Sequence, residues 1–167
     1  MVEAGARDAL QPALLDRLTD QDPGRQTEGR EQRVISRAQL RACVLRDLSW
    51  LFNTTNLVGE IDFTGCPLAE QSTVNYGLVA LSGKPISSLD FTELDHALKQ
   101  AILNFEPRIL PHTLSVRGMT SPDAADRHNV LSFEIRGSLW GQPYPMDLLL
   151  KTDVDLESGE VRIAEGR

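Results

Sequence analysis

Residues 101–110, which read AILNFEPRIL, mark the point where the chain changes from one kind of secondary structure to another. Before this segment, apolar residues recur three or four positions apart, which is typical of a helix with one buried face. After it, they alternate with polar residues, which is typical of strands in a half-buried sheet. Pro107 favours the change because proline lacks an amide hydrogen and disfavours a helical conformation in the preceding residue.

Two main helices are predicted before this junction. The first is expected to begin after Ser36, which forms a capping box with Gln39, and to continue to about residue 53. The second is expected to begin after Asp90, with Glu93 in the corresponding position, and to end before Pro107. The stretch between them, residues 54–88, is rich in glycine and proline. It is predicted to be mostly loop, with any short strands or helical turns left unassigned.

Strands are predicted after the junction. Alternating patterns cover residues 113–117, 131–136 and 146–155, and a last short run at 161–163 follows a turn at 157–160. Such patterns indicate antiparallel strands with one buried face. We therefore expect an α+β domain in which two main helices pack on one face of a small, mostly antiparallel C-terminal sheet.

Residues 1–34 are predicted to form an N-terminal arm, and residues 35–167 the folded domain. The segment 20–33 contains no large apolar residue, so it is expected to be a linker. Before it, Leu14, Leu15 and Leu18 lie on one side of a predicted short helix. Because two helical turns are marginal in water, this helix either docks on its own domain or folds on a partner.

Composition excludes several classes of function. A formal net charge of −7 disfavours binding to nucleic acid or anionic lipid, and an aromatic content of 5% disfavours stacking on bases or sugars. The N-terminus lacks the apolar run of a secretory signal, and no apolar run is long enough to cross a bilayer. We therefore expect a cytoplasmic protein.

Candidates for catalysis are few. Glycoside hydrolysis needs two carboxyl groups across a sugar cleft, which Glu60, Asp62 or Glu70 could supply. An acidic chain provides such pairs by chance, however, and aromatic residues to stack on sugar are scarce. We expect no catalytic residue, no metal and no cofactor, with a peptidoglycan hydrolase as the disfavoured alternative.

The Glu106-Pro107-Arg108 sequence allows two interpretations. It is a simple helix stop, or it is a rigid elbow that holds two charged side chains in set directions. In the second case Arg108 binds a carboxylate with two parallel hydrogen bonds, inside the chain or across an interface, while Glu106 accepts from another partner. Reversing either charge is then expected to leave the chain folded.

Five segments, taken in order, resemble one known family. They are residues 14–20 (LLDRLTD), 45–54 (LRDLSWLFNT), 74–83 (VNYGLVALSG), 101–110 and 133–137 (FEIRG). Together they resemble the small baseplate wedge family of contractile injection machines, which includes TssE of type VI secretion systems and its phage relative. One departure is at residues 55–56, where the family has basic residues.

The resemblance implies a structural subunit with no substrate. Such a subunit joins the wedge proteins TssF and TssG, with TssK as a further candidate, in a cytoplasmic baseplate docked at the inner membrane. It also starts assembly of the TssB and TssC sheath, for which an exposed sheet edge would serve as a template. A regulatory adaptor on the same fold is the alternative.

The resemblance also implies roles for particular residues. Those expected to bind other proteins are Glu106, Pro107, Arg108, Leu14, Leu15 and Leu18. Those expected to be structural members of family motifs are Arg46, Asp47, Leu48, Asn53, Thr54, Asn75, Tyr76 and Gly77.

Overall fold

The computed structural model describes residues 12–19, 23–24, 35–80, 91–119, 130–141 and 144–166. Its elements, in chain order, are α1 (Leu14–Leu18), α2 (Arg37–Phe52), α3 (Pro67–Glu70), the 3-10 turn η2 (Thr73–Asn75), α4 (Phe91–Phe105), the 3-10 turn η4 (Pro111–Thr113), β1 (Ser115–Met119), β2 (Val130–Leu139), β3 (Met146–Asp155) and β4 (Val161–Glu165). No described helix is long and apolar enough to span a membrane.

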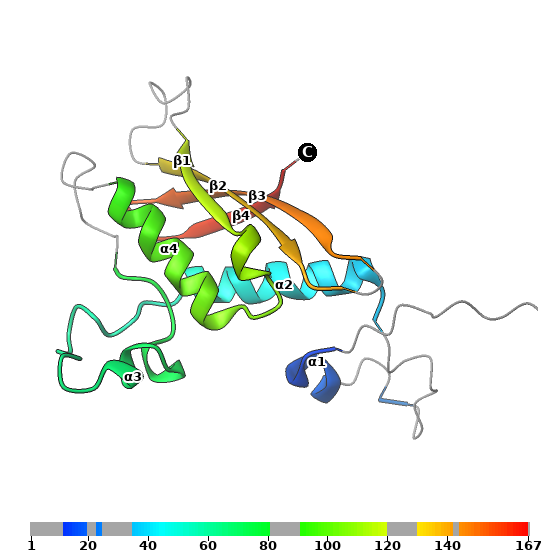
Figure 1. Ribbon diagram of the computed structural model, residues 1–167, viewed down its shortest axis with the longest axis horizontal. Coiled ribbons are helices and arrows are strands. Elements are labelled where there is room, and N and C mark those ends of the chain that lie inside the picture. The colour runs from blue at the N-terminus through cyan, green and yellow to red at the C-terminus, as the bar shows by residue number, and fades with distance from the viewer. Residues whose placement is uncertain are drawn as a thin grey trace, which may run out of the picture.

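The four strands form one antiparallel sheet in the order β1-β2-β3-β4. The two middle strands pair over ten residues each, from Val130 opposite Asp155 to Leu139 opposite Met146. Helices α2 and α4 pack against this sheet (Figure 1). The predicted α+β architecture is therefore confirmed, with all described strand pairs antiparallel.

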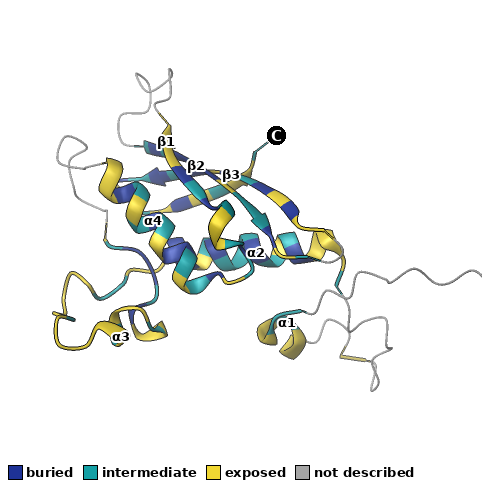
Figure 2. Ribbon diagram, in the orientation of Figure 1, coloured by how far each residue is buried: buried dark blue, intermediate teal, exposed yellow. Residues whose placement is uncertain are grey.

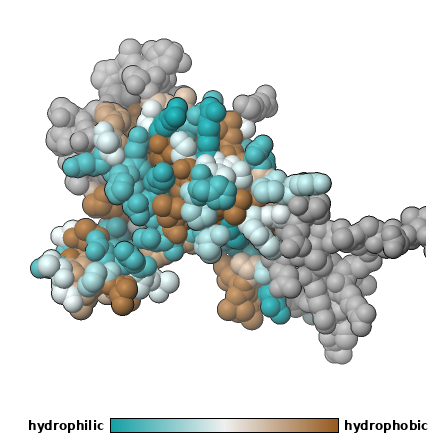
Figure 3. All heavy atoms as spheres, in the orientation of Figure 1, coloured by the Kyte–Doolittle hydropathy of each residue, from teal (hydrophilic) through white to brown (hydrophobic). Residues whose placement is uncertain are grey.

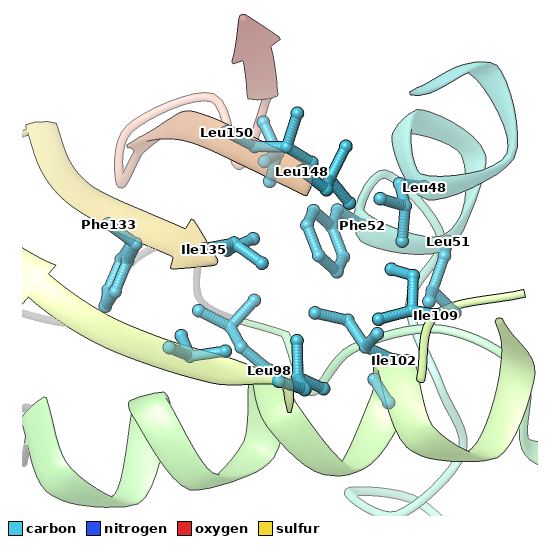
Figure 4. Close-up of a cluster of buried hydrophobic side chains, with 14 of the residues drawn as sticks. Leu48, Leu51, Phe52, Leu98, Ile102, Ile109, Phe133, Ile135, Leu148 and Leu150 are labelled. Carbon is cyan, nitrogen blue, oxygen red and sulfur yellow. The ribbon is translucent and has the colours of Figure 1, made fainter. Parts of the chain in front are cut away.

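A single apolar core joins the helices to the sheet. Leu48 on α2 and Leu98 and Ile102 on α4 belong to the same buried cluster as Phe133 and Ile135 on β2 (Figure 4). All five side chains are shielded from solvent. Burying an aliphatic or aromatic side chain of this size contributes roughly 1.5–3 kcal/mol, so this layer is the main source of the domain's stability.

The start of α2 agrees with the prediction. Ser36 Oγ accepts a hydrogen bond from the Gln39 amide at 3.2 Å, and Gln39 Oε1 accepts from the Ser36 amide at 2.8 Å. Helix α4 covers the predicted range, but its expected cap at Asp90 lies outside the described residues. Most of the predicted linker lies outside them too, so the division into arm and domain stays a prediction.

The stretch after α2 folds back on itself. Thr55 and Leu78 form a parallel bridge, in which the Leu78 amide donates to the Thr54 carbonyl at 2.8 Å. Gly77 has a φ of 121°, and a Cβ there would overlap the Thr54 carbonyl. This crossing therefore requires glycine for two reasons, its backbone conformation and its lack of a side chain.

Gly77→Ala should lower the free energy of unfolding by about 1–3 kcal/mol, because alanine is strained at positive φ and meets backbone atoms. Gly59→Ala is the matched control, since a Cβ there meets nothing within 4 Å. Urea denaturation followed by circular dichroism measures both. Equal stability of the two variants would contradict this account of Gly77.

Candidate functional site

Helix α4 ends in a corner that leads into the sheet. The Glu106 amide still donates to the Ile102 carbonyl at 2.8 Å, and Pro107 then interrupts the helix. At the next residue, the Arg108 carbonyl accepts from the Trp140 amide at 2.7 Å, just beyond the end of β2. Within three residues, 106–108, the backbone thus passes from a hydrogen bond with α4 to a hydrogen bond with the residue that follows β2.

Arg108 folds back on Glu106. Its Nε lies 2.6 Å from Glu106 Oε1 and its Nη2 lies 2.5 Å from Oε2, so the guanidinium binds the carboxylate with two bonds. Glu106 is only 3% exposed. The elbow therefore turns Glu106 inward onto Arg108, which differs from the prediction that Glu106 accepts from a second partner. A buried carboxylate is costly unless it is paired, and Arg108 supplies the pairing charge.

Asp47 of α2 completes the cluster. Its Oδ2 lies 2.5 Å from Arg108 Nη2, and its Oδ1 accepts from Arg46 Nε at 2.9 Å. Burial lowers the pKa of Arg108, but the carboxylates of Glu106 and Asp47 raise it more, so Arg108 stays charged. One guanidinium thereby ties α2 to the end of α4.

The middle stretch supports the same cluster. The Tyr76 hydroxyl donates to the Asp47 carbonyl at 3.4 Å, and its ring meets Phe105 edge-on at 5.1 Å between centroids. Burial raises the pKa of Tyr76, and the nearby carboxylates of Asp47 and Glu106 raise it further. Asn75, also buried, accepts from the Leu57 amide at 2.9 Å and holds this stretch in place.

Asn53, at the end of α2, binds the start of β4. Its Nδ2 donates to the Val161 carbonyl at 2.9 Å, and its Oδ1 accepts from the Val161 amide at 2.9 Å. A side-chain amide presents one donor and one acceptor side by side, which matches one backbone residue of a strand. Asn53 thus occupies the first pairing position on the outer edge of β4.

Beyond Val161, no described group hydrogen-bonds the outward backbone of β4, although Arg41 of α2 lies 3.8 Å from the Glu165 carboxylate. Two hydrogen bonds at the ends of β4 show which of its residues direct their backbone groups toward β3. The Asp155 amide donates to the Glu160 carbonyl, and the Gly166 amide donates to the Leu149 carbonyl. Because inward and outward groups alternate, Ile163 and Glu165 turn their amides and carbonyls away from the sheet. At the opposite border, α4 lies against β1, where Gly118 is close to Phe91 and Asp95.

A groove of about 530 Å³ lies beside the charge cluster. Pro107, Trp50 and Trp140 line it, and both indoles are 50% exposed. Ala13 and Leu15 of the N-terminal segment border the same groove.

Helix α1 docks on its own domain through charge. Asp16 lies 2.7 Å from Arg46 Nη1, whereas Leu14 and Leu18 are 71% and 73% exposed (Figure 2). Burial raises the pKa of Asp16, but its bonds with Arg46 and Cys43 lower it more, so the acid is ionised at neutral pH. The leucines predicted to bind a partner therefore remain accessible.

The profile of the family described as "Baseplate wedge protein gp25" matches residues 38–144, which is more than half of the chain. The chain belongs to this family. No curated protein and no solved structure was found to match it. Members are structural baseplate wedge components of contractile injection machines and are not enzymes.

The matched region, residues 38–144, covers the first part of the folded domain. It contains α2, α4, β1, β2 and the whole charge cluster, whereas α1, β3 and β4 lie outside it. The motif residues Arg46, Asp47, Tyr76 and Glu106 of this baseplate wedge protein, far apart in the chain, converge at the cluster. Their roles in binding other proteins stay proposals.

The three candidate acids for hydrolysis, Glu60, Asp62 and Glu70, do border one shallow hollow in the wedge protein. Asp62 accepts from the Thr64 hydroxyl and amide, and these bonds lower its pKa. A general acid for glycoside cleavage needs a raised pKa instead. No described group of three histidine, cysteine, aspartate or glutamate side chains is placed to hold a metal ion.

Sequence patterns missed three residues of the groove region. Trp50 does not share the helical spacing of the buried residues of α2, and this spacing could have predicted an exposed tryptophan. Trp140 follows a strand and carried no such signal. Asp16 was hidden because its partner, Arg46, lies beyond the predicted linker.

Arg108→Met should lower the free energy of unfolding of the wedge protein by about 3–5 kcal/mol, because it leaves the buried Glu106 carboxylate unpaired. The double variant Glu106→Gln with Arg108→Met should recover part of this loss, which urea denaturation would measure. For the same reason, charge reversal at Glu106 is now expected to destabilise the fold. If the double variant instead loses as much unfolding free energy as the two single variants together, the two side chains are not coupled.

Proposed function

We propose that the chain is the TssE-type wedge subunit of a type VI secretion baseplate, which joins TssF and TssG and starts the TssB and TssC sheath at the inner membrane. The family match supports a baseplate wedge role. The ordered resemblance of its segments to TssE, including the arm at residues 14–20, supports the secretion system over a phage tail.

The carrying observation is the outer edge of β4, where no described residue beyond Asn53 hydrogen-bonds the outward backbone groups. Sheath subunits that exchange strands need a first edge on which to pair, and an unpaired edge recruits a strand through backbone hydrogen bonds. On β4 the available groups belong to Ile163 and Glu165, while Asn53 occupies Val161. An incoming strand would therefore pair from residue 163 onward and stop at Asn53.

The groove beside the cluster is proposed as the surface for wedge partners. Exposed tryptophans next to a proline form an apolar surface of the kind that carries most of the binding energy at protein interfaces. Leu14, Leu15 and Leu18 extend this surface along α1. Glu106, Pro107 and Arg108 contribute by holding the groove wall at a fixed angle, with only Pro107 fully at the surface.

Ile163→Pro should stop sheath formation in the native cell while leaving the chain folded. Proline removes the outward amide of the edge but no bond to β3, and edge strands tolerate such a change. Ile163→Ala is the matched control, because it loses the same packing but keeps the amide. The number of fluorescently labelled sheaths per cell should fall at least tenfold in the proline variant and stay unchanged in the alanine variant. A wild-type number of sheaths in the proline variant would rule out strand addition at this position.

Trp50→Ser with Trp140→Ser should abolish recovery of TssF and TssG with the tagged chain from native cells, because loss of two anchoring aromatics weakens binding by at least about 30-fold. Tyr144→Ser removes an exposed aromatic residue that does not line the groove, and it should change nothing. Undiminished recovery would remove the groove's proposed role. Recovery of a different partner that depends on Leu14 and Leu18 would favour the regulatory adaptor.

A further inference from the structure

A second groove, of about 650 Å³, lies between α4 and the stretch that carries α3. Its lining includes none of the charged residues of the cluster and no residue of β4, and it shares only Phe105 with the first groove. One wall is a face of α4 formed by Glu93, His96, Gln100 and Asn104, which follow helical spacing. From residue 93 to residue 104 this wall runs for about 16 Å.

The floor of the groove is apolar, whereas the opposite wall carries both an apolar and an acidic side chain. Leu78, Leu94 and Ala101 form an apolar floor, and Val58 and Glu70 stand on the far wall. The α3 stretch also exposes apolar side chains at its surface (Figure 3), including Leu68 and Val74. An apolar floor between polar rims is the usual layout of a groove that receives an apolar stripe of a partner.

The charges at the rim all have one sign. Glu70 and Glu93 line the two opposite walls, and the described lining residues include no lysine or arginine. Residues 54–80 as a whole contain Glu60, Asp62 and Glu70 but no basic residue. A partner with basic residues on both sides of its apolar stripe would complement these rims.

On the far wall, the amides of residues 56–58 are already bonded within the chain. The Asn56 amide donates to the Leu78 carbonyl at 2.8 Å, the Leu57 amide to Asn75 Oδ1 at 2.9 Å, and the Val58 amide to Asn56 Oδ1 at 3.4 Å. The near wall is a helix, whose interior amides are bonded within it. Along α4 and residues 56–58, an occupant must therefore satisfy its own backbone, which favours an α-helix over an extended strand.

We propose that this groove binds a basic amphipathic helix of about three turns from a partner protein, with its leucine-type side chains on Leu78, Leu94 and Ala101 and its lysines or arginines near Glu70 and Glu93. This site goes beyond the proposed wedge and sheath contacts. It gives the baseplate wedge protein a third surface for a partner of defined charge.

The test uses the full-length ¹⁵N-labelled chain and a synthetic 14-residue peptide with leucines at helical spacing and lysines elsewhere. Saturable chemical-shift changes should centre on Ala97, Gln100 and Asn104. A peptide with glutamates in place of the lysines should not bind. Ala97→Trp should fill the groove and weaken binding at least tenfold, whereas Ala97→Ser should not.

Charge reversal separates the groove from general attraction to an acidic protein. Glu70→Lys and Glu93→Lys should each weaken binding about two- to fivefold, as expected for exposed ion pairs. Glu160→Lys, which makes the same change in net charge on the β3–β4 turn, should have little effect. Equal effects of the three reversals, shifts centred on Trp50 or β4, or self-association of the chain through α4 would overturn the proposal.

Discussion

The pairing of Arg108 with Glu106 and Asp47 is the constraint on which the rest of the structure depends. Pro107 follows the end of α4, where the Glu106 side chain is buried, and a buried carboxylate is tolerated only beside a positive charge. Because the guanidinium that supplies this charge also binds Asp47, the helix end cannot move without moving α2. The corner is therefore rigid for electrostatic as well as steric reasons.

This rigidity determines how the two borders of the sheet are presented. Helix α4 lies against β1, while α2 lies against β4, where Asn53 binds the backbone of Val161 and Arg41 lies 3.8 Å from the Glu165 carboxylate. Fixing both helices at the corner thus leaves β4 open over a short, defined length. A structural subunit that must align the first strand of a larger assembly needs an edge of this kind, with a fixed angle and a fixed starting residue.

Local signals in the sequence were enough for the two main helices and the four strands, but not for the short elements α3, η2 and η4. The capping box at Ser36 and the helix stop at Pro107 are formed by neighbouring residues, and both are present as predicted. The orientation of Glu106 was not predictable in this way, because Arg108 also pairs with Asp47 at a separation of 61 positions. The Asn53 contact with Val161 spans 108 positions. No periodic pattern encodes such contacts, so the site emerged only from the folded arrangement.

Hydrogen–deuterium exchange on β4 tests the central claim most directly, since it reports each backbone amide in the free chain and in the chain capped by the first sheath ring. In the free chain, the amides of Ile163 and Glu165 should exchange rapidly, while those of Arg162 and Ala164, bonded to β3, should be protected. In the assembly, Ile163 and Glu165 should become protected as well. Protection of Ile163 and Glu165 in the free chain, or unchanged rapid exchange in the assembly, would contradict the account.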